Sequence, residues 1–365
     1  MPRFFRLDEP ALDGLIEALR QQGYTAVGPR VRDGAVIYDE ISSVADLPQG
    51  WASEQEAGKY RLNRDPSAGP FDYVIGPSSW KQWLHPPEAR LFAAERENGA
   101  FRILPNTTSA PRYALVGVRA CELAAIAIQD RVLLGDRYTD PIYQARRKAL
   151  FVVAVNCTRS AATCFCASMQ TGPRAVEGFD LALTPVGNGR QYLGETGTDA
   201  GAAVAGELGW PEAPPEMMSE AAETVRAAAR AQTRNVALEG LAEALTAAAE
   251  HPRWETVAKR CMACGNCTLA CPTCFCTTVE DTSTVDGARA ERWRKWDSCF
   301  TQSFSYIHGG SVRTSVKSRY RQWLTHKLAY WQQQFGTPGC VGCGRCITWC
   351  PAGIDLTEEA RALRA

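Results

Sequence analysis

The chain has 365 residues, 45% of them hydrophobic, and its 40 basic and 40 acidic side chains give a formal net charge of zero. This length suffices for two or three domains with a sizeable core, and the balanced charge argues against nucleic-acid or anionic-membrane binding. No window approaches the roughly 18 uninterrupted apolar residues of a membrane span. MPRFFRLDEP reaches Asp8 and Glu9 without an apolar segment, so it is not expected to be a signal peptide. The 15 cysteines are therefore predicted to be reduced metal ligands in a cytoplasmic protein.

Residues 1–215 are predicted to form a mixed α/β domain. The apolar spacing of residues 11–21 predicts a helix that stops before Gly23. Residues 71–76 (FDYVIG) predict a short strand, and residues 179–196 predict a hairpin that turns at Asn188–Gly189.

Cysteines lie at the element boundaries of this domain. The run ALVGV predicts a strand that turns at Arg119–Ala120 into a helix, which places Cys121 at a helix N-terminus where N–H groups favour a thiolate. ALFVVAVNC predicts a second buried strand that ends on Cys157. Cys164 and Cys166 lie in a loop that Gly and Pro terminate.

The Pro-rich segment WPEAPPEMM, residues 210–218, marks the end of this domain. Residues 216–258 are predicted to form a helical linker, because the Ala- and Glu-rich stretch 219–250 favours a long helix or a helix pair. Residues 259–365 are predicted to form a bacterial-ferredoxin-like domain for two [4Fe-4S] clusters, with a long insertion at residues 277–339.

That domain contains two runs of three cysteines separated by two residues, each followed by three residues, a fourth cysteine and proline. In such runs the fourth cysteine binds the cluster that the other run mainly holds. The predicted ligands of the first cluster are Cys261, Cys264, Cys267 and Cys350. Those of the second are Cys340, Cys343, Cys346 and Cys271. A zinc ribbon is the alternative, but its two CxxC pairs do not require the third cysteine and proline.

The insertion is locally basic, since residues 298–354 contain no Asp or Glu. Cations near a cluster favour its reduced state and raise its potential; they can equally be solvated side chains on a helix whose apolar face carries Trp323, Tyr330 and Trp331. Docking of an acidic partner is a third interpretation, and nucleic-acid binding the least favoured. The cations are Arg313, Lys317, Arg319, Arg321 and Lys327.

Seven cysteines remain, and the triplet CFC occurs twice among them. A third cluster is expected at Cys121, Cys157, Cys164 and Cys166. A fourth is possible at Cys274, Cys276 and Cys299 if a non-cysteine ligand such as Asp297 completes it. Burial as small apolar side chains is the alternative for all seven, and a cluster that combines the two CFC loops is also conceivable.

The motifs of bond-making enzymes are missing. There is no GxGxxG after a strand and no GxxxxGK[ST] loop. The four histidines are scattered, and no Ser–His–Asp or paired-carboxylate arrangement stands out. No independent active site is therefore evident.

Several motifs together resemble one family: GVRACELAAI, NCTRSAATCFCASMQTGP, CMACGNCTLACPTCFCTT, WDSCF and RYRQWLTHKLAYWQQQFGTPGCVGCGRCITWCPAGIDLTEE. They are similar to the β subunit of cytoplasmic sulfhydrogenases, the NAD(P)-linked NiFe hydrogenases, and equally to the iron–sulfur subunit of anaerobic sulfite reductase, from about Gly117 to Glu359. The resemblance implies the eight ferredoxin ligands directly; the ligand role of the other cysteines follows from spacing alone.

The resemblance further implies an electron relay that connects two partners. A flavin- and NAD(P)-binding subunit lies on one side, and the hydrogenase small and large subunits lie on the other. For the sulfite reductase branch, a sirohaem subunit takes the place of the hydrogenase. Two rivals remain: a sulfur-reducing enzyme that uses an open iron at Cys274, Cys276 and Cys299, and an iron–sulfur sensor or assembly factor. The terminal acceptor, the direction of electron flow and the stoichiometry do not follow from the sequence.

Overall fold

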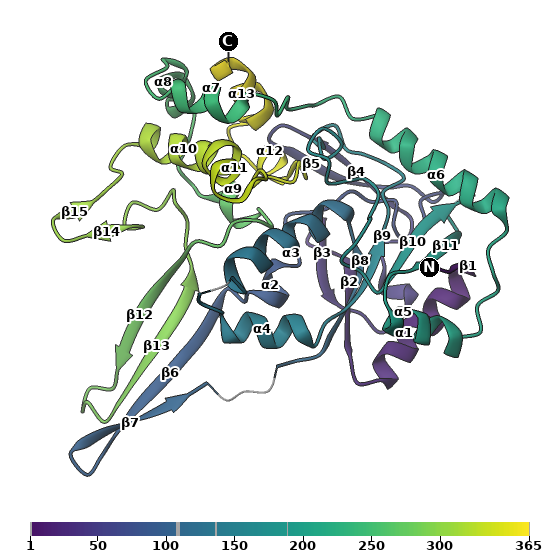
Figure 1. The fold of residues 1–365 in the computed structure, drawn as a ribbon, viewed down its shortest axis with the longest axis horizontal. Helices are drawn as coiled ribbons and strands as arrows, with labels where there is room; N and C mark the ends of the chain where they lie inside the picture. The colour runs from purple at the N-terminus through teal and green to yellow at the C-terminus, as the bar shows by residue number, and fades with distance from the viewer. Residues whose placement is uncertain (1, 107–109, 136, 188, 365) are drawn as a thin grey trace.

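The computed structural model describes residues 2–106, 110–135, 137–187 and 189–364. A seven-stranded mixed sheet organises the N-terminal half (Figure 1). Its order is β1 (Phe4–Asp8), β11 (Gln191–Thr196), β10 (Leu181–Val186), β9 (Phe151–Val155), β8 (Tyr113–Val118), β2 (Thr25–Arg32) and β3 (Ala35–Glu40). The four central strands β10, β9, β8 and β2 are parallel, and the outer pairings are antiparallel. The predicted mixed α/β fold is therefore present.

Helices cover both faces of this sheet. The apolar side chains of α1 (Glu9–Gln21) and α5 (Asp199–Glu207) pack with one set of strand residues. Those of α2 (Lys81–Leu84), α3 (Ala120–Leu133) and α4 (Pro141–Lys148) pack with the other set. The alternation of side chains along β8 and β9 explains this division, because successive residues point to opposite faces. A short 3-10 helix (Val44–Asp46) lies beside α1.

The strand, turn and helix predicted around Cys121 are confirmed as β8, Arg119 and α3. The predicted hairpin is confirmed as β10 and β11, although Asn188 of its expected turn lies outside the described residues. The strand predicted at residues 71–76 is wrong. This segment has a turn at Phe71 and a bend at Tyr73 and no strand partner among the described residues, because side chains satisfy its carbonyl groups: Arg119 donates to the carbonyls of Phe71 and Tyr73.

Three helices follow the main sheet: α6 (Pro215–Arg230), α7 (Leu241–Ala247) and α8 (Arg253–Ala258). Of the long helix or helix pair expected at residues 219–250, the structure has two helices, α6 and α7, and α6 begins earlier than expected, at a proline that suits a first turn. The remaining helices are α9 (Asn266–Leu269), α10 (Val316–Thr325), a π-helix (His326–Tyr330), α11 (Trp331–Phe335), α12 (Arg345–Thr348) and α13 (Leu356–Arg364). Their apolar residues form a second core, with Trp254, Trp323 and Leu324 buried.

The two halves of the chain share a sheet. Its order is β12 (Thr277–Ser283), β13 (Arg289–Trp296), β6 (Glu88–Glu97) and β7 (Ala100–Pro105), so a hairpin from each half pairs along β13 and β6. This sheet extends away from the rest of the molecule (Figure 1). Two hairpins form separate two-stranded sheets: β4 (Trp51–Glu56) pairs with β5 (Lys59–Arg64), and β14 (Tyr306–Ile307) pairs with β15 (Gly310–Ser311). None of the described helices has the length and apolar character that a membrane crossing requires.

Candidate metal centres

The first ferredoxin-like loop encloses a small hollow. Ala263 and Gly265 have left-handed backbones, with φ of 51° and 76°, as a tight turn requires. The backbone N–H groups of Ala263 and Ile354 donate over 3.4 Å to the sulfurs of Cys261 and Cys350. The hollow is lined by all four predicted ligands of the first cluster, Cys261, Cys264, Cys267 and Cys350. This donor set and its N–H bonds to sulfur fit a thiolate-bound cluster.

The second loop repeats this backbone, since Gly342 and Gly344 have φ of 63° and 77°. Burial raises the pKa of the Cys346 thiol well above its usual range, and the thiols of Cys340, Cys343 and Cys271 raise it further. The four predicted ligands of the second cluster therefore act on one another at close range. They also suit an anionic cluster, because Lys327 donates to the Cys271 sulfur over 3.2 Å.

The second loop lies directly against the TCFC loop of the N-terminal half. Phe165 donates its N–H to the Gly342 carbonyl over 2.9 Å, and the hydroxyls of Thr163 and Thr348 are 2.9 Å apart. A Cβ added at Gly342 would lie 2.6 Å from the Cys166 nitrogen. Only glycine allows so close an approach of two backbones.

This contact brings the cysteines of the N-terminal half to the second loop. Burial, together with the nearby thiols of Cys157 and Cys343, raises the pKa of Cys166 to about 12. The same thiols act on Cys121 and Cys164. The Gln232 side chain donates to the Cys166 sulfur over 3.2 Å. The predicted third group, Cys121, Cys157, Cys164 and Cys166, is thus gathered in one place beside the second.

A buried ion pair joins these two groups. Arg345, inside the second loop, pairs with Glu122, the residue after Cys121, and each is 1% exposed. Glu122 also accepts hydrogen bonds of 2.8 Å from the Tyr38 hydroxyl and the Trp80 indole. This pair was not predicted from the sequence, although a charged residue between two ligand cysteines was a signal for it.

The remaining cysteines occur as two pairs. The Cys276 and Cys299 thiols share a hydrogen bond, which lowers the pKa of Cys276 to about 7. Cys274 instead shares a hydrogen bond with Cys271, which raises the pKa of Cys274. Asp297 lies near Cys276, since its N–H donates to the Cys276 carbonyl over 2.9 Å. The structure therefore places Cys274 closest to the second group and the other two beside Asp297.

The basic residues of the insertion are divided between the surface and the interior. Lys317 and Arg321 pair with Glu255 and Glu250 at the surface. Lys327 and Arg319 are buried, as are Trp323 and Trp331, whereas Tyr330 is exposed. One buried lysine that was not predicted from the sequence is Lys81 on α2, which lies near the thiols of Cys271 and Cys274. Nothing in its local sequence indicates this position.

Within the described residues, no three His, Cys, Asp or Glu side chains converge as the ligands of a single metal ion do. A [4Fe-4S] cube is bound through separate irons, so its thiolates need not meet at one point. The assignment of ligands to clusters therefore depends on motif spacing and on the neighbours described above.

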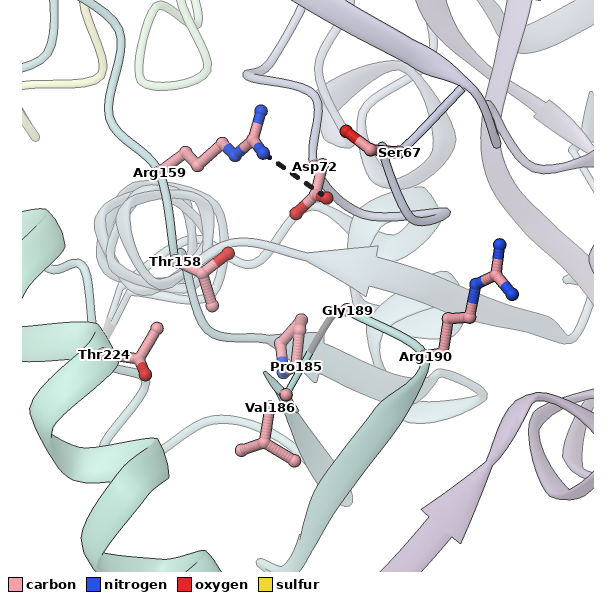
Figure 2. A pocket seen from close by; sticks show the side chains of 10 residues that line it. Ser67, Asp72, Thr158, Arg159, Pro185, Val186, Gly189, Arg190 and Thr224 are labelled. Carbon is pink, nitrogen blue, oxygen red and sulfur yellow. Dashed lines mark ion pairs between the residues drawn. The ribbon is translucent and has the colours of Figure 1, made fainter. Parts of the chain in front are cut away.

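A cavity of about 760 Å³ lies at the carboxyl ends of β9 and β10 (Figure 2). Arg159 points toward Asp72, with its Nη2 4.0 Å from a carboxylate oxygen, and Arg190 lies away from this pair. No cysteine lines this cavity. Its lining includes Thr158 and Arg159, which directly follow Cys157 in the chain.

Comparison with known proteins supports the cluster motifs. The family described as a 4Fe-4S dicluster domain matches residues 260–354. The chain is 33% identical over 285 residues to the sulfhydrogenase 2 subunit beta of Pyrococcus furiosus, which covers 76% of this chain and 83% of that protein. No solved structure matches the chain. The chain therefore belongs to the family of sulfhydrogenase beta subunits and carries a 4Fe-4S dicluster domain.

Proposed function

We propose that this protein is the iron–sulfur electron-transfer subunit of a sulfhydrogenase-type complex. It links a flavin- and NAD(P)-binding subunit to the small and large subunits of a NiFe hydrogenase. When bound, the clusters accept and donate single electrons, whereas nicotinamide chemistry transfers two. Membership of the family and the dicluster domain support this proposal.

The observation that carries the proposal is that the cysteine groups lie next to one another in a series. Cys267 of the first group acts electrostatically on Cys346 of the second, and Cys343 of the second acts on Cys121 of the third. Neighbouring groups are thus in electrostatic contact from the first loop to the N-terminal half. The protein's part is to hold successive centres close together and to exclude water between them.

The first loop is the end of this series that faces solvent. Cys264 is exposed, and two apolar side chains beside it are also exposed, Met262 at 69% and Leu269 at 47%. A partner that covers these side chains brings its own cofactor close to the first group. We therefore propose that one of the partner subunits docks here.

The test is anaerobic preparation of the full chain, followed by iron and sulfide analysis and EPR during dithionite reduction. Two clusters require about eight irons per chain, and about twelve or sixteen indicate one or two more. Iron well below eight, or zinc in its place, contradicts the proposal.

A second experiment separates the relay from catalysis at the Cys276–Cys299 pair. A Cys299→Ser variant is compared with the wild type in the complete complex, with turnover of NAD(P)H-driven hydrogen chemistry and of sulfur reduction measured side by side. Slower turnover in both assays supports a relay centre. Loss of sulfur reduction alone, with the complex intact, points to an active site on this chain.

A further inference from the structure

Two buried lysines approach the cysteines from opposite halves of the chain. Lys81, on α2, is 6% exposed, and its ammonium lies 3.9 Å above the ring of Trp296. Lys327, on the π-helix, is 5% exposed and donates to the Thr273 hydroxyl over 3.0 Å and to the Cys271 sulfur over 3.2 Å. π-Helices are rare and frequently mark functional sites.

These lysines have no carboxylate partner among the described residues, in contrast to most other lysines of the chain. An ammonium removed from water is strongly unfavourable unless a negative charge balances it. The groups that both ammoniums act on include the sulfurs of Cys271 and Cys274, which act most strongly on each of them. The two ammoniums also repel each other, which makes a compensating negative charge at these sulfurs more important still.

The position of Lys327 is central. Besides Cys271 and Cys274 it acts on Cys267 of the first group, on Cys340 of the second, and on the Cys276–Cys299 pair. The basic residue that acts on Cys261, Arg319, instead has its guanidinium bonded to the carbonyls of Arg313 and Thr314. Arg319 is also a buried cation without a carboxylate partner among the described residues, but its guanidinium is held by carbonyl groups, whereas Lys327 donates directly to a ligand sulfur of the second group.

We propose that Lys327 and Lys81 are positioning residues that raise the reduction potential of the centre bound through Cys271 above that of the centre in the first loop. Reduction adds a negative charge to the centre, and an unscreened ammonium beside a ligand sulfur stabilises that charge. Electrons in the relay then reside at the second centre. This inference depends on the proposed function, because it requires clusters at both loops.

The experiment is an EPR-monitored redox titration of the full chain and of its Lys327→Met and Lys81→Met variants. At a fixed solution potential, the ratio of reduced to oxidised second centre should fall at least tenfold in Lys327→Met, equivalent to about 59 mV for one electron. Lys81→Met should shift it in the same direction but less, and Lys327→Arg, which keeps the charge, should stay closer to the wild type. The first centre, identified by the signal that Cys264→Ser alters, is the internal reference.

The matched control is Lys295→Met. Lys295 precedes Trp296 on β13, and its ammonium already pairs with Glu280 at 2.9 Å and Glu88 at 3.4 Å. Its removal should leave both midpoints unchanged.

Unmoved midpoints in Lys327→Met and Lys81→Met, at full iron content, overturn the inference. A purely structural role lowers iron content or thermal stability and leaves the potential of the surviving clusters unchanged. If the Lys327→Met variant does not assemble its clusters, the midpoint of the Lys81→Met variant decides the question. Lys81 makes no hydrogen bond to a thiol among the described residues, so its replacement should leave cluster assembly intact. Failure of the proposed function has a different signature, since the wild type itself then lacks iron.

Discussion

The two ferredoxin-like loops share one cysteine spacing and one backbone path, yet their surroundings differ. The first faces solvent, with Cys264, Met262 and Leu269 exposed. The second is held against the N-terminal half through Phe165 and Thr163. The same motif therefore provides one accessible centre and one enclosed centre.

Two positions within the loops account for this difference. Ala263 of the first loop corresponds to Gly342 of the second, and Asn266 corresponds to Arg345. Glycine permits the close approach of the TCFC loop, and arginine supplies the buried partner of Glu122. Small changes inside a shared motif thus determine which loop the rest of the protein covers.

The largest effect is expected for Glu122→Gln. Loss of the carboxylate leaves Arg345 charged and unpaired in the interior, which costs roughly 3–5 kcal/mol. Thermal unfolding should show a large decrease in the midpoint, with cluster loss from the second loop first. Glu223→Gln, which alters an exposed pair on α6, is the control and should change nothing measurable. Equal effects of the two variants contradict the role assigned to the buried pair.

Gly342→Ala should destabilise the second loop more than the equivalent change destabilises the first. The new Cβ meets the backbone of Cys166 and Phe165, so overpacking adds about 1–3 kcal/mol to the cost of a left-handed alanine. Gly265→Ala carries the same backbone cost but meets only side chains, those of Ser298 at 3.2 Å and Thr268 at 3.7 Å. Iron content and unfolding midpoints of the two variants measure the difference. If Gly265→Ala is the more damaging change, close contact with the TCFC loop is not the reason that position 342 is glycine.

Oxidative damage should distinguish the centres by exposure. Because Cys264 is exposed while Cys271 is buried, ferricyanide with a chelator should remove the EPR signal of the first centre roughly tenfold faster than that of the second. Parallel decay of the two signals would show that solvent reaches both loops equally.

The smallest effect concerns pH. Burial, with Arg294 and Lys81 nearby, lowers the pKa of His85 to about 3, whereas an unfolded histidine titrates near 6.5. Between these values the unfolded chain binds a proton that the folded chain does not, so stability falls as the pH is lowered below about 6.5.

From pH 7 to 5.5 this contribution is about 1 kcal/mol. His85→Phe retains an aromatic ring beside Trp296, which lies 6.3 Å from His85 between ring centroids. Its unfolding midpoint should decrease less than that of the wild type over this interval. An identical decrease in both proteins would exclude His85 as the source.

Much of the fold was predictable wherever local pattern and tertiary packing agree. Helix α1 follows from apolar periodicity, the β8–α3 unit follows from an apolar run that ends at Arg119, and the hairpin follows from its turn residues. Residues 71–76 have the composition of a strand, but Gln55, Ser53 and Arg119 satisfy their backbone groups in place of a neighbouring strand. Such long-range side-chain bonds leave no local signature in the sequence.

The sequence by itself determined the chemistry of this protein, because ligand spacing within a short loop is a local property. The two cysteine runs identify a dicluster domain without reference to the rest of the chain. Only the tertiary structure decided which loop is enclosed, that Glu122 meets Arg345, and that Lys81 and Lys327 face the same sulfurs. These contacts join residues that are far apart in the chain, and burial strengthens their electrostatic effect, so they depend on packing that no single segment encodes.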